Sequence, residues 1–293
     1  MRKEISILGL GSMGTAIALN LKKKYKIFGH DIKKYNAKSI KNFTFVKSLK
    51  EIFLKTNIFI IIVLNENQCQ KIFDTFIEIK KRLKISKNHT IINCTTVSPN
   101  WVKKIYTKLK KNNFDYIDCP VSGGPKKAIN GKLSLIISSK ENVYKKNLAL
   151  LKDLGNNIYN LGNKIGAGST VKIINNCLAG IQIVSAAEAI ILAKNEKINL
   201  KKIFKIINNS SGQSWMFADR GKRMIEKKYF KPLSRLSIFK KDMKLANQLR
   251  KKHFINLPLT KVALKMYEKG CEQGLENFDD SGVIRLLEKK VVN

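Results

Sequence analysis

Short apolar runs alternate with longer amphipathic stretches through the first half of the chain. Six of these runs are predicted to be β-strands because they are rich in β-branched and aliphatic residues and are bounded by polar or turn residues. They are Ile5–Leu8, Ile27–His30, Ile58–Leu64, Thr90–Cys94, Tyr116–Pro120 and Leu133–Ser138. Residues 59–63 show no polar alternation, which is typical of a central parallel strand buried on both faces. Strands interleaved with helices predict βαβ units with right-handed crossovers, so we predict a doubly wound α/β (Rossmann) domain over residues 1–163.

The pattern changes in the second half. Residues 169–194 contain no proline and form one apolar stretch, which predicts a single long helix. Helical patterns continue to the end, interrupted by Asn and Gly near 195–199 and 208–212. We therefore predict an all-helical domain over residues 164–293, for substrate binding and dimerisation. A helix this apolar needs burial on more than one side, so we expect a homodimer or homotetramer.

The composition is that of an ordinary globular protein except for its charge. Hydrophobic residues make up 44% and charged residues 27%, but the formal net charge is +36. The chain holds fifty lysines and only seven arginines, whereas nucleic-acid readers rely heavily on arginine. The lysines occur in nearly every segment and form no basic tail. We therefore expect no nucleic-acid partner, and we expect the charge to raise the local concentration of anionic substrates.

Cysteines and histidines give no sign of a metal site. The five cysteines are widely spaced and form no CxxC pair, which favours reduced thiols over a disulfide framework or zinc site. The three histidines are scattered, so we expect no catalytic metal. Residues 5–21 carry no charge and follow two basic residues, as in a signal peptide, but the run is short for a membrane span and is rich in glycine. We expect a cytoplasmic protein without a membrane span.

A glycine-rich turn follows the first predicted strand and opens a helix. It has the pattern G-x-G-x-x-G and consists of Gly9, Leu10, Gly11, Ser12, Met13 and Gly14. In a dinucleotide-binding turn, the three glycines allow the tight turn, the approach of backbone to the pyrophosphate, and close packing of helix on strand. The helix N-terminus then offers N–H groups to the phosphates. Asp31 ends the second predicted strand, where a carboxylate accepts ribose hydroxyls and repels a 2′-phosphate. This favours NAD, while Lys33 and Lys34 leave NADP open.

Two further segments carry candidate substrate chemistry. Asp118–Pro125 ends a predicted strand in a loop whose N–H groups and hydroxyl can hold a carboxylate, although a plain Gly-Pro turn explains it equally well. Lys172 and Asn176 are four residues apart and therefore project from one helix face. Most of the lysines belong on the surface, but Lys172 lies in the most apolar helix. A lysine there needs an anionic partner or a lowered pKa, and both indicate an active site.

Four segments together resemble the signatures of β-hydroxyacid dehydrogenases, a family that includes 3-hydroxyisobutyrate dehydrogenase and tartronate semialdehyde reductase. They are the glycine turn, Pro120–Gly124, Gly166–Asn176 and Lys241–Ala246, and they occur in the expected order along the whole chain. The resemblance implies an oxidoreductase that acts on CH–OH groups with NAD or NADP. Ser214–Phe217 and Asp279–Ser281, among other segments, are most similar to the L-threonate dehydrogenases. Several of these residues are interpreted as packing residues.

The resemblance also implies roles for individual residues. Lys172 matches the catalytic lysine, a general acid–base, and Asn176 matches the asparagine that orients the substrate. The loop that holds the substrate carboxylate matches Ser122, Gly123 and Gly124. Besides the glycine turn and Asp31, the cofactor positions are Leu64, Thr96 near the nicotinamide, and Lys241, which closes over the cofactor.

This chain departs from the family pattern at two positions. Asn93 replaces a usual acid and Thr95 a usual serine, and we expect little functional effect from either. The implied reaction is the oxidation of L-threonate to 2-oxo-tetronate (2-dehydro-L-erythronate), with 3-hydroxyisobutyrate or tartronate semialdehyde as alternative substrates. A non-catalytic module that binds NAD or nucleic acid is the remaining alternative, against which the retained active-site residues argue. Candidate partners for the threonate hydroxyls are Asn175, Ser211, Gln213 and Ser214.

Overall fold

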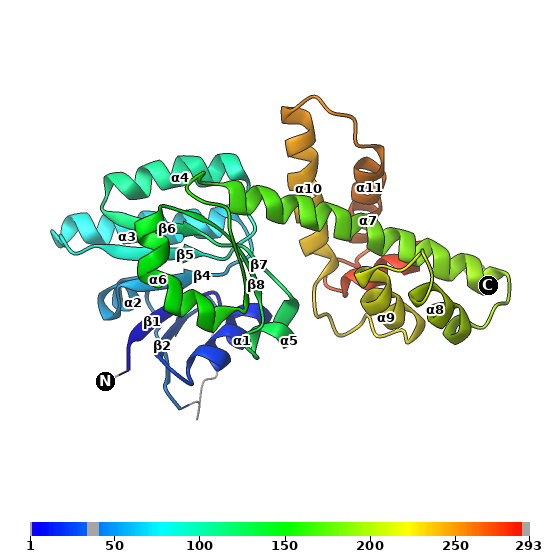
Figure 1. Ribbon diagram of the computed structural model, residues 1–293, viewed down its shortest axis with the longest axis horizontal. Helices are drawn as coiled ribbons and strands as arrows, with labels where there is room; N and C mark the ends of the chain where they lie inside the picture. Colours follow the sequence, from blue (N-terminus) through cyan, green and yellow to red (C-terminus); the bar gives the residue numbers. More distant parts are fainter. Residues whose placement is uncertain (1, 34–40, 289–293) are drawn as a thin grey trace. The chain divides into compact units, whose positions relative to one another are not determined.

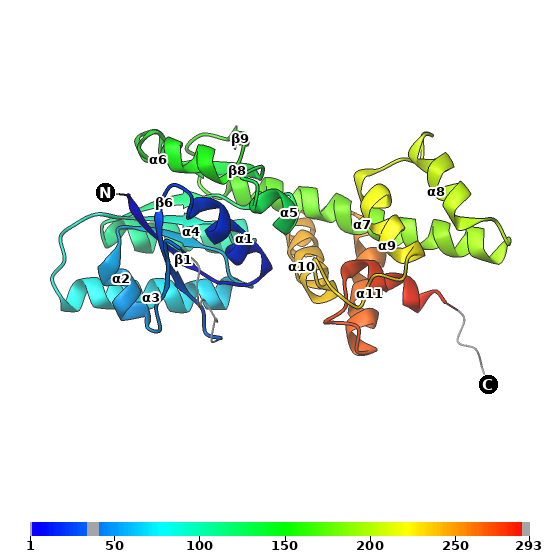
Figure 2. The same cartoon turned by 90° about the horizontal axis from the view of Figure 1, so that it is seen from below.

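The computed structural model describes residues 2–33 and 41–288 of the chain (Figures 1 and 2). Two compact units are present, Met1–Lys172 and Ile173–Asn293. The first is an α/β unit and the second is helical, which confirms the predicted fold class. The boundary predicted after residue 163 precedes the first turn of helix α7 (Ala167–Asn195), which begins in the first unit and continues into the second.

The α/β unit is built on one mainly parallel sheet. Its parallel part has the order β3-β2-β1-β4-β5-β6, the doubly wound arrangement in which the direction of strand addition reverses between the neighbouring parallel strands β1 and β4. Beyond β6, the sheet continues with β8, which pairs antiparallel with both β6 and β7. The last strand, β9, pairs parallel with β8. The strands are β1 (Glu4–Leu8), β2 (Lys26–His30), β3 (Phe43–Phe45), β4 (Ile58–Ile61), β5 (His89–Asn93), β6 (Phe114–Asp118), β7 (Val121–Ser122), β8 (Ser134–Ser139) and β9 (Asn157–Asn160).

All six predicted strands are confirmed, with changes at their ends. The strand predicted over Ile58–Leu64 ends at Ile61. The Ile62 N–H still donates to the Leu8 carbonyl of β1, but the N–H groups after it bind side chains. Val63 N–H donates to the Thr95 hydroxyl, and Leu64 N–H donates to the Gln68 side chain. The sequence pattern missed the short strands β3, β7 and β9. The predicted parallel βαβ arrangement is present from β1 to β6, and the antiparallel pairing of β8 with β6 and β7 was not predicted.

Helices cover both faces of the sheet (Figure 2). One face packs against α1 (Ser12–Leu21), α5 (Gly124–Ala128) and α6 (Glu141–Leu154). The opposite face packs against α2 (Leu49–Lys55), α3 (Glu66–Arg82) and α4 (Pro99–Lys111). Each helix of the second group begins at a side chain that accepts an N–H from the first turn, which satisfies a donor without an intrahelical partner. These capping side chains are Ser48, Asn65 and Ser98.

The second unit is organised around α7, which confirms the predicted long helix. By length and composition alone α7 is apolar enough to cross a membrane, with a mean hydropathy of 1.6 in its most apolar window. However, Ile183, Ala187 and Ile190 on α7 are at most 2% exposed in the core of the helical unit, as expected for a core helix. The other elements are α8 (Leu200–Asn208), η1 (Phe217–Gly221), α9 (Lys222–Ile225), α10 (Leu236–Lys252), α11 (Pro258–Glu272) and η2 (Asp280–Leu286).

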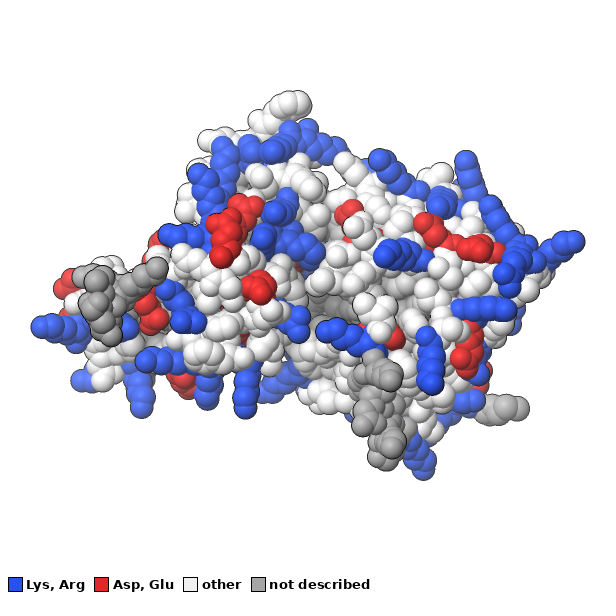
Figure 3. Space-filling view, turned by 180° about the vertical axis from the view of Figure 1, so that it is seen from behind, with Lys and Arg blue, Asp and Glu red and all other residues white. Residues whose placement is uncertain are grey.

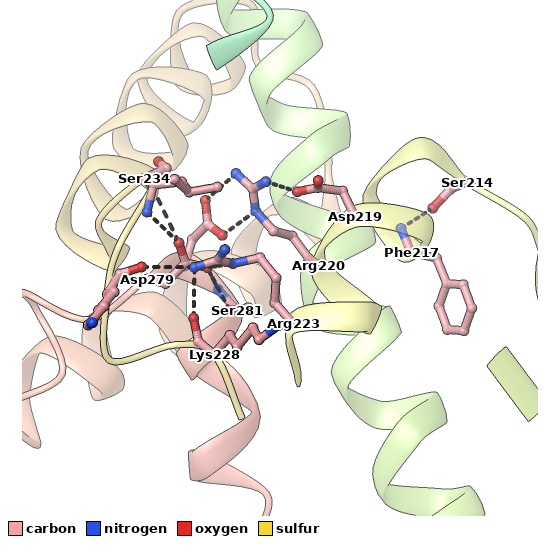
Figure 4. A network of polar contacts seen from close by, with 12 residues as sticks. Ser214, Phe217, Asp219, Arg220, Arg223, Lys228, Ser234, Asp279 and Ser281 are labelled. Atoms are coloured by element: carbon pink, nitrogen blue, oxygen red, sulfur yellow. Dashed lines mark hydrogen bonds and ion pairs between the residues drawn. The ribbon is translucent and has the colours of Figure 1, made fainter. Parts of the chain in front are cut away.

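A buried ion-pair network connects η1 and α9 with the start of η2 (Figure 4). The Arg220 guanidinium forms two bonds to Asp280, with Nε 2.5 Å from Oδ1 and Nη2 3.0 Å from Oδ2. Arg223 Nε donates to Asp279 Oδ1 at 3.0 Å. The Ser214 hydroxyl, a candidate partner for threonate, already accepts the Phe217 N–H. Ser214–Phe217 and Asp279–Ser281, two of the segments that resemble L-threonate dehydrogenases, therefore contribute to the internal structure of the helical unit.

Candidate functional site

The predicted cofactor segments of the α/β unit follow four neighbouring parallel strands. Gly9–Gly14 follows β1, Asp31 follows β2, Leu64 lies beyond β4 and Thr96 lies beyond β5. The carboxyl ends of parallel strands lie along the same edge of a sheet, and doubly wound sheets bind ligands at the point where strand order reverses. The structure therefore brings these residues to one edge, around the reversal between β1 and β4.

The glycine turn fits a dinucleotide. Gly9 has a φ of +95°, and a Cβ there would overlap the Ile62 carbonyl oxygen. A Cβ on Gly14 would overlap the Gly9 carbonyl oxygen, so this glycine is required by the packing of α1 on β1. Gly11 differs, because a Cβ there would meet nothing within 4 Å. The chain thus leaves open space at the N-terminus of α1, where N–H groups can face a pyrophosphate.

Asp31 supports the glycine turn directly. Its Oδ2 accepts the Leu10 N–H at 2.6 Å, and its Oδ1 accepts the Lys33 N–H at 2.9 Å. A carboxylate oxygen has two lone pairs, so each oxygen can still accept a ribose hydroxyl. Lys34, the other residue that left NADP open, lies outside the described residues.

The two departures from the family pattern belong to one buried network beside Thr96. Asn93 Oδ1 accepts the Thr95 N–H at 3.2 Å, and Asn93 Nδ2 donates to the Tyr116 hydroxyl at 2.9 Å. Thr95 in turn uses its hydroxyl to hold the Val63 N–H at 3.0 Å. Asn93 and Thr95 therefore connect the loops that follow β4 and β5, and both side chains have hydrogen-bond partners in the interior.

The predicted carboxylate loop follows β6 at the same edge. Ser122 is paired with Ser134 in the short ladder between β7 and β8. Gly123 and Gly124 have φ angles of +125° and +71°, a region that residues with a Cβ rarely adopt. A Cβ on Gly124 would meet nothing within 4 Å. A Cβ on Gly123 would lie 2.7 Å from the Lys127 side chain, so the open space begins at Gly124. The two glycines thus turn the backbone directly after Ser122, as a loop that holds a carboxylate requires.

Lys172 lies one turn beyond a buried anchor of α7. The residue itself is 8% exposed. Three residues before it, Ser169 donates to Asp118 twice, through its backbone N–H at 2.9 Å and its hydroxyl at 2.7 Å. Asp118 is the last residue of β6 and also accepts the Ser138 hydroxyl at 3.1 Å. Burial raises the pKa of Asp118 to about 6, although the donors from Ser169 and Ser138 oppose that shift.

Two predicted site residues of the helical unit share a carboxylate. Asn176 Nδ2 donates to Asp242 Oδ2 at 2.6 Å, and Lys241 Nζ lies 3.0 Å from Asp242 Oδ1. Asp242 is 2% exposed. Sequence reasoning assigned no role to Asp118 or Asp242. For Asp118 the available signal was an acidic residue at the end of a strand with apolar neighbours, because a buried carboxylate needs partners. Asp242 follows two lysines in α10 and carries no such signal.

Positive charge is spread widely over the face of the protein that Figure 3 shows. On the face shown in Figure 3, Lys and Arg side chains are distributed over the view, with fewer Asp and Glu between them. On that face the positive charge therefore forms no single patch.

Comparisons with known proteins agree with this geometry. Residues 4–162 match the family described as the NAD binding domain of 6-phosphogluconate dehydrogenase, and residues 166–287 match the NAD-binding domain of NADP-dependent 3-hydroxyisobutyrate dehydrogenase. The chain is 30% identical to L-threonate dehydrogenase of Haemophilus influenzae, over 97% of this chain and 94% of that protein. It is 29% identical to 2-(hydroxymethyl)glutarate dehydrogenase of Eubacterium barkeri, over 99% and 97%. The crystal structure of 3-hydroxyisobutyrate dehydrogenase from Salmonella typhimurium superimposes with a TM-score of 0.86, at 30% identity over 97% and 99% of the two chains.

Proposed function

Because the chain belongs to the 3-hydroxyisobutyrate dehydrogenase family of NAD- or NADP-dependent oxidoreductases, we propose that it oxidises L-threonate with NAD. In this proposal Lys172 is the general acid–base. The burial of Lys172 on an apolar helix that is anchored at the end of β6 carries the proposal, because that strand leads into the carboxylate loop. The position of Asp31 beneath the glycine turn supports NAD over NADP.

The chemistry follows from the residues at the edge of the sheet. Ser122, Gly123 and Gly124 hold the substrate carboxylate through the hydroxyl and backbone N–H groups, and Asn176 orients the substrate. The bound dinucleotide supplies the hydride acceptor. As the C–H electrons leave the hydroxyl carbon, the Nζ of Lys172 accepts the hydroxyl proton, and a C=O bond forms. In the reverse direction the same ammonium returns the proton to the carbonyl oxygen. Positioned proton transfer of this kind is worth about 10²–10⁴-fold in rate.

The substrate is assigned by an assay of its own. The relatives at 30% and 29% identity carry different substrate names, L-threonate and 2-(hydroxymethyl)glutarate. A panel of L-threonate and 3-hydroxyisobutyrate with NAD and NADP, and of tartronate semialdehyde with NADH and NADPH, tests the assignment through the gain or loss of the absorbance of the reduced nicotinamide. We expect the highest kcat/KM for L-threonate with NAD. A higher value for either other compound would replace L-threonate as substrate.

Replacement of the lysine tests the proposed mechanism. We expect Lys172→Ala to lower kcat by at least about 100-fold while the dissociation constant for NADH stays within about twofold. Lys194→Ala is a matched control, because Lys194 is an exposed lysine on the same helix. We expect this variant to keep full activity. A Lys172→Ala enzyme with half of the wild-type activity would remove Lys172 from the mechanism.

We also propose a cytoplasmic homodimer or homotetramer. Exposed apolar side chains on α7 support the association, with Ile174 at 60%, Leu178 at 59% and Leu192 at 65% exposure. Large exposed apolar side chains that recur along one helix favour a protein interface. Light scattering of the purified protein measures the oligomeric state, and a monomer at micromolar concentration would refute this part of the proposal.

A further inference from the structure

We propose that Asp118 is a positioning residue that sets the place of Lys172 relative to the Pro120–Gly124 loop. This inference rests on the proposed function, because it assigns Asp118 a task in the same proton transfer. Asp118 does not have to touch the substrate. It acts through the first turn of α7.

The Asp118 carboxylate binds that first turn from outside the helix. The first N–H groups of a helix have no intrahelical acceptor, and here two of them are satisfied from the sheet. Ser169 N–H donates to Asp118 Oδ2 at 2.9 Å, and Gly168 N–H donates to the Ser138 hydroxyl at 3.2 Å. The Ser138 hydroxyl in turn donates to Asp118 Oδ2 at 3.1 Å, and the Ser169 hydroxyl donates to Oδ1 at 2.7 Å. One carboxylate therefore joins β6, β8 and the start of α7.

The contact between the Asp118 carboxylate and the start of α7 is fully buried and closely packed. Asp118, Ser138 and Ser169 are each 0% exposed. A Cβ on Gly168 would lie 2.5 Å from the Ile136 carbonyl oxygen and 3.1 Å from the Asp118 carbonyl oxygen, so the helix backbone rests directly on β6 and β8. The helix start cannot move closer to the sheet, and the hydrogen bonds prevent it from moving away.

The same carboxylate is connected, through short stretches of chain, to the two groups whose separation matters for catalysis. Lys172 follows Ser169 by three residues, which places the two on the same side of the helix, one turn apart. In the other direction along the chain, the Pro120–Gly124 loop begins two residues after Asp118. A change in the contact between Asp118 and Ser169 therefore shifts the Lys172 ammonium relative to the substrate carboxylate. A misplacement of about 1 Å is sufficient to lower a rate by about 100-fold.

A purely structural role predicts different measurements from a positioning role. Asp118→Asn keeps the size of the side chain but presents an NH₂ group to one of the donors, and Ser169→Ala removes only the 2.7 Å bond. Ser6→Ala is the matched control, because the Ser6 hydroxyl is also buried in this sheet and lies 2.7 Å from the Thr56 hydroxyl. Each variant is examined for kcat and KM of the hydroxy acid, NADH affinity by fluorescence, and melting temperature.

We expect Asp118→Asn and Ser169→Ala to lower kcat by about tenfold or more, whereas KM and NADH affinity change by less than about threefold. We expect Ser6→Ala to lower only the melting temperature. If both site variants fold and match Ser6→Ala in kcat, the positioning role is wrong although the proposed function stands. If Asp118→Asn does not fold, Ser169→Ala decides by the same criterion. A wild-type protein that turns over no hydroxy acid with either dinucleotide refutes the proposed function, and the inference with it.

Discussion

Removal of the Asp280 carboxylate is expected to be among the most destabilising changes in the helical unit. The Arg220 side chain is 10% exposed and the Asp280 side chain 0% exposed, and two bonds join them. Burial alone would lower the pKa of Arg220, but the facing carboxylate of Asp280 outweighs burial and raises the pKa. Arg220 therefore stays charged, and Asp280→Ala leaves a buried cation without its main partner. Asp219, whose side chain is 40% exposed, still contacts the guanidinium but lies closer to water.

The expected cost follows from the two bonds. Hydrogen bonds to a charged group contribute about 1.5–3 kcal/mol each, and breaking a buried ion pair by removing one partner costs about 3–5 kcal/mol. We therefore expect Asp280→Ala to lower the free energy of unfolding by about 3–5 kcal/mol in chemical denaturation at pH 7. The double variant Arg220→Met/Asp280→Ala removes both charges, so we expect it to be less destabilised than the sum of the single variants, by about 2 kcal/mol or more.

A surface pair provides the comparison. Lys24 contacts Asp153 at 2.5 Å, but the Lys24 side chain is 69% exposed, and we expect Lys24→Ala to cost less than about 1 kcal/mol. If Asp280→Ala costs no more than Lys24→Ala, or if the double variant is as unstable as the two single variants added together, the reasoning about the buried network is refuted.

Two further predictions concern the α/β unit. Gly14→Ala places a Cβ on the Gly9 carbonyl oxygen, so we expect it to lower the melting temperature. Gly11→Ala fills open space, so we expect it to weaken NADH binding by about tenfold or more at unchanged melting temperature. Equal melting temperatures for the two variants would contradict this. Asp118 has a folded-state pKa of about 6 against an ordinary value of 3.8, so its contribution to stability is fully present below pH 3.8 and is lost as the pH rises through 6. Urea unfolding is expected to show that the free energy of unfolding of the wild type, relative to Asp118→Asn, falls by about 2 kcal/mol between pH 4 and pH 7. A constant difference would show that the pKa is not raised.

Local patterns were sufficient to predict the elements whose burial is uniform. The apolar run 59–63 predicted a central strand, and β4 lies between β1 and β5, as expected. The proline-free stretch 169–194 predicted one helix, and α7 spans Ala167–Asn195. The short strands β3, β7 and β9 were missed, since two to four residues carry too little periodicity to be distinguished from loops.

The sequence by itself determined which residues are available for chemistry. It determined the glycine turn, the loop at Ser122–Gly124 and the lysine on an apolar helix, because backbone freedom and burial leave a local pattern in the chain. Only the tertiary structure decided how these segments are held. Asp118 meets Ser169 across 51 positions of sequence, and Asp242 meets Asn176 across 66. A hydrogen bond between residues so far apart depends on the place of whole elements in the fold, and no short stretch of sequence records that distance.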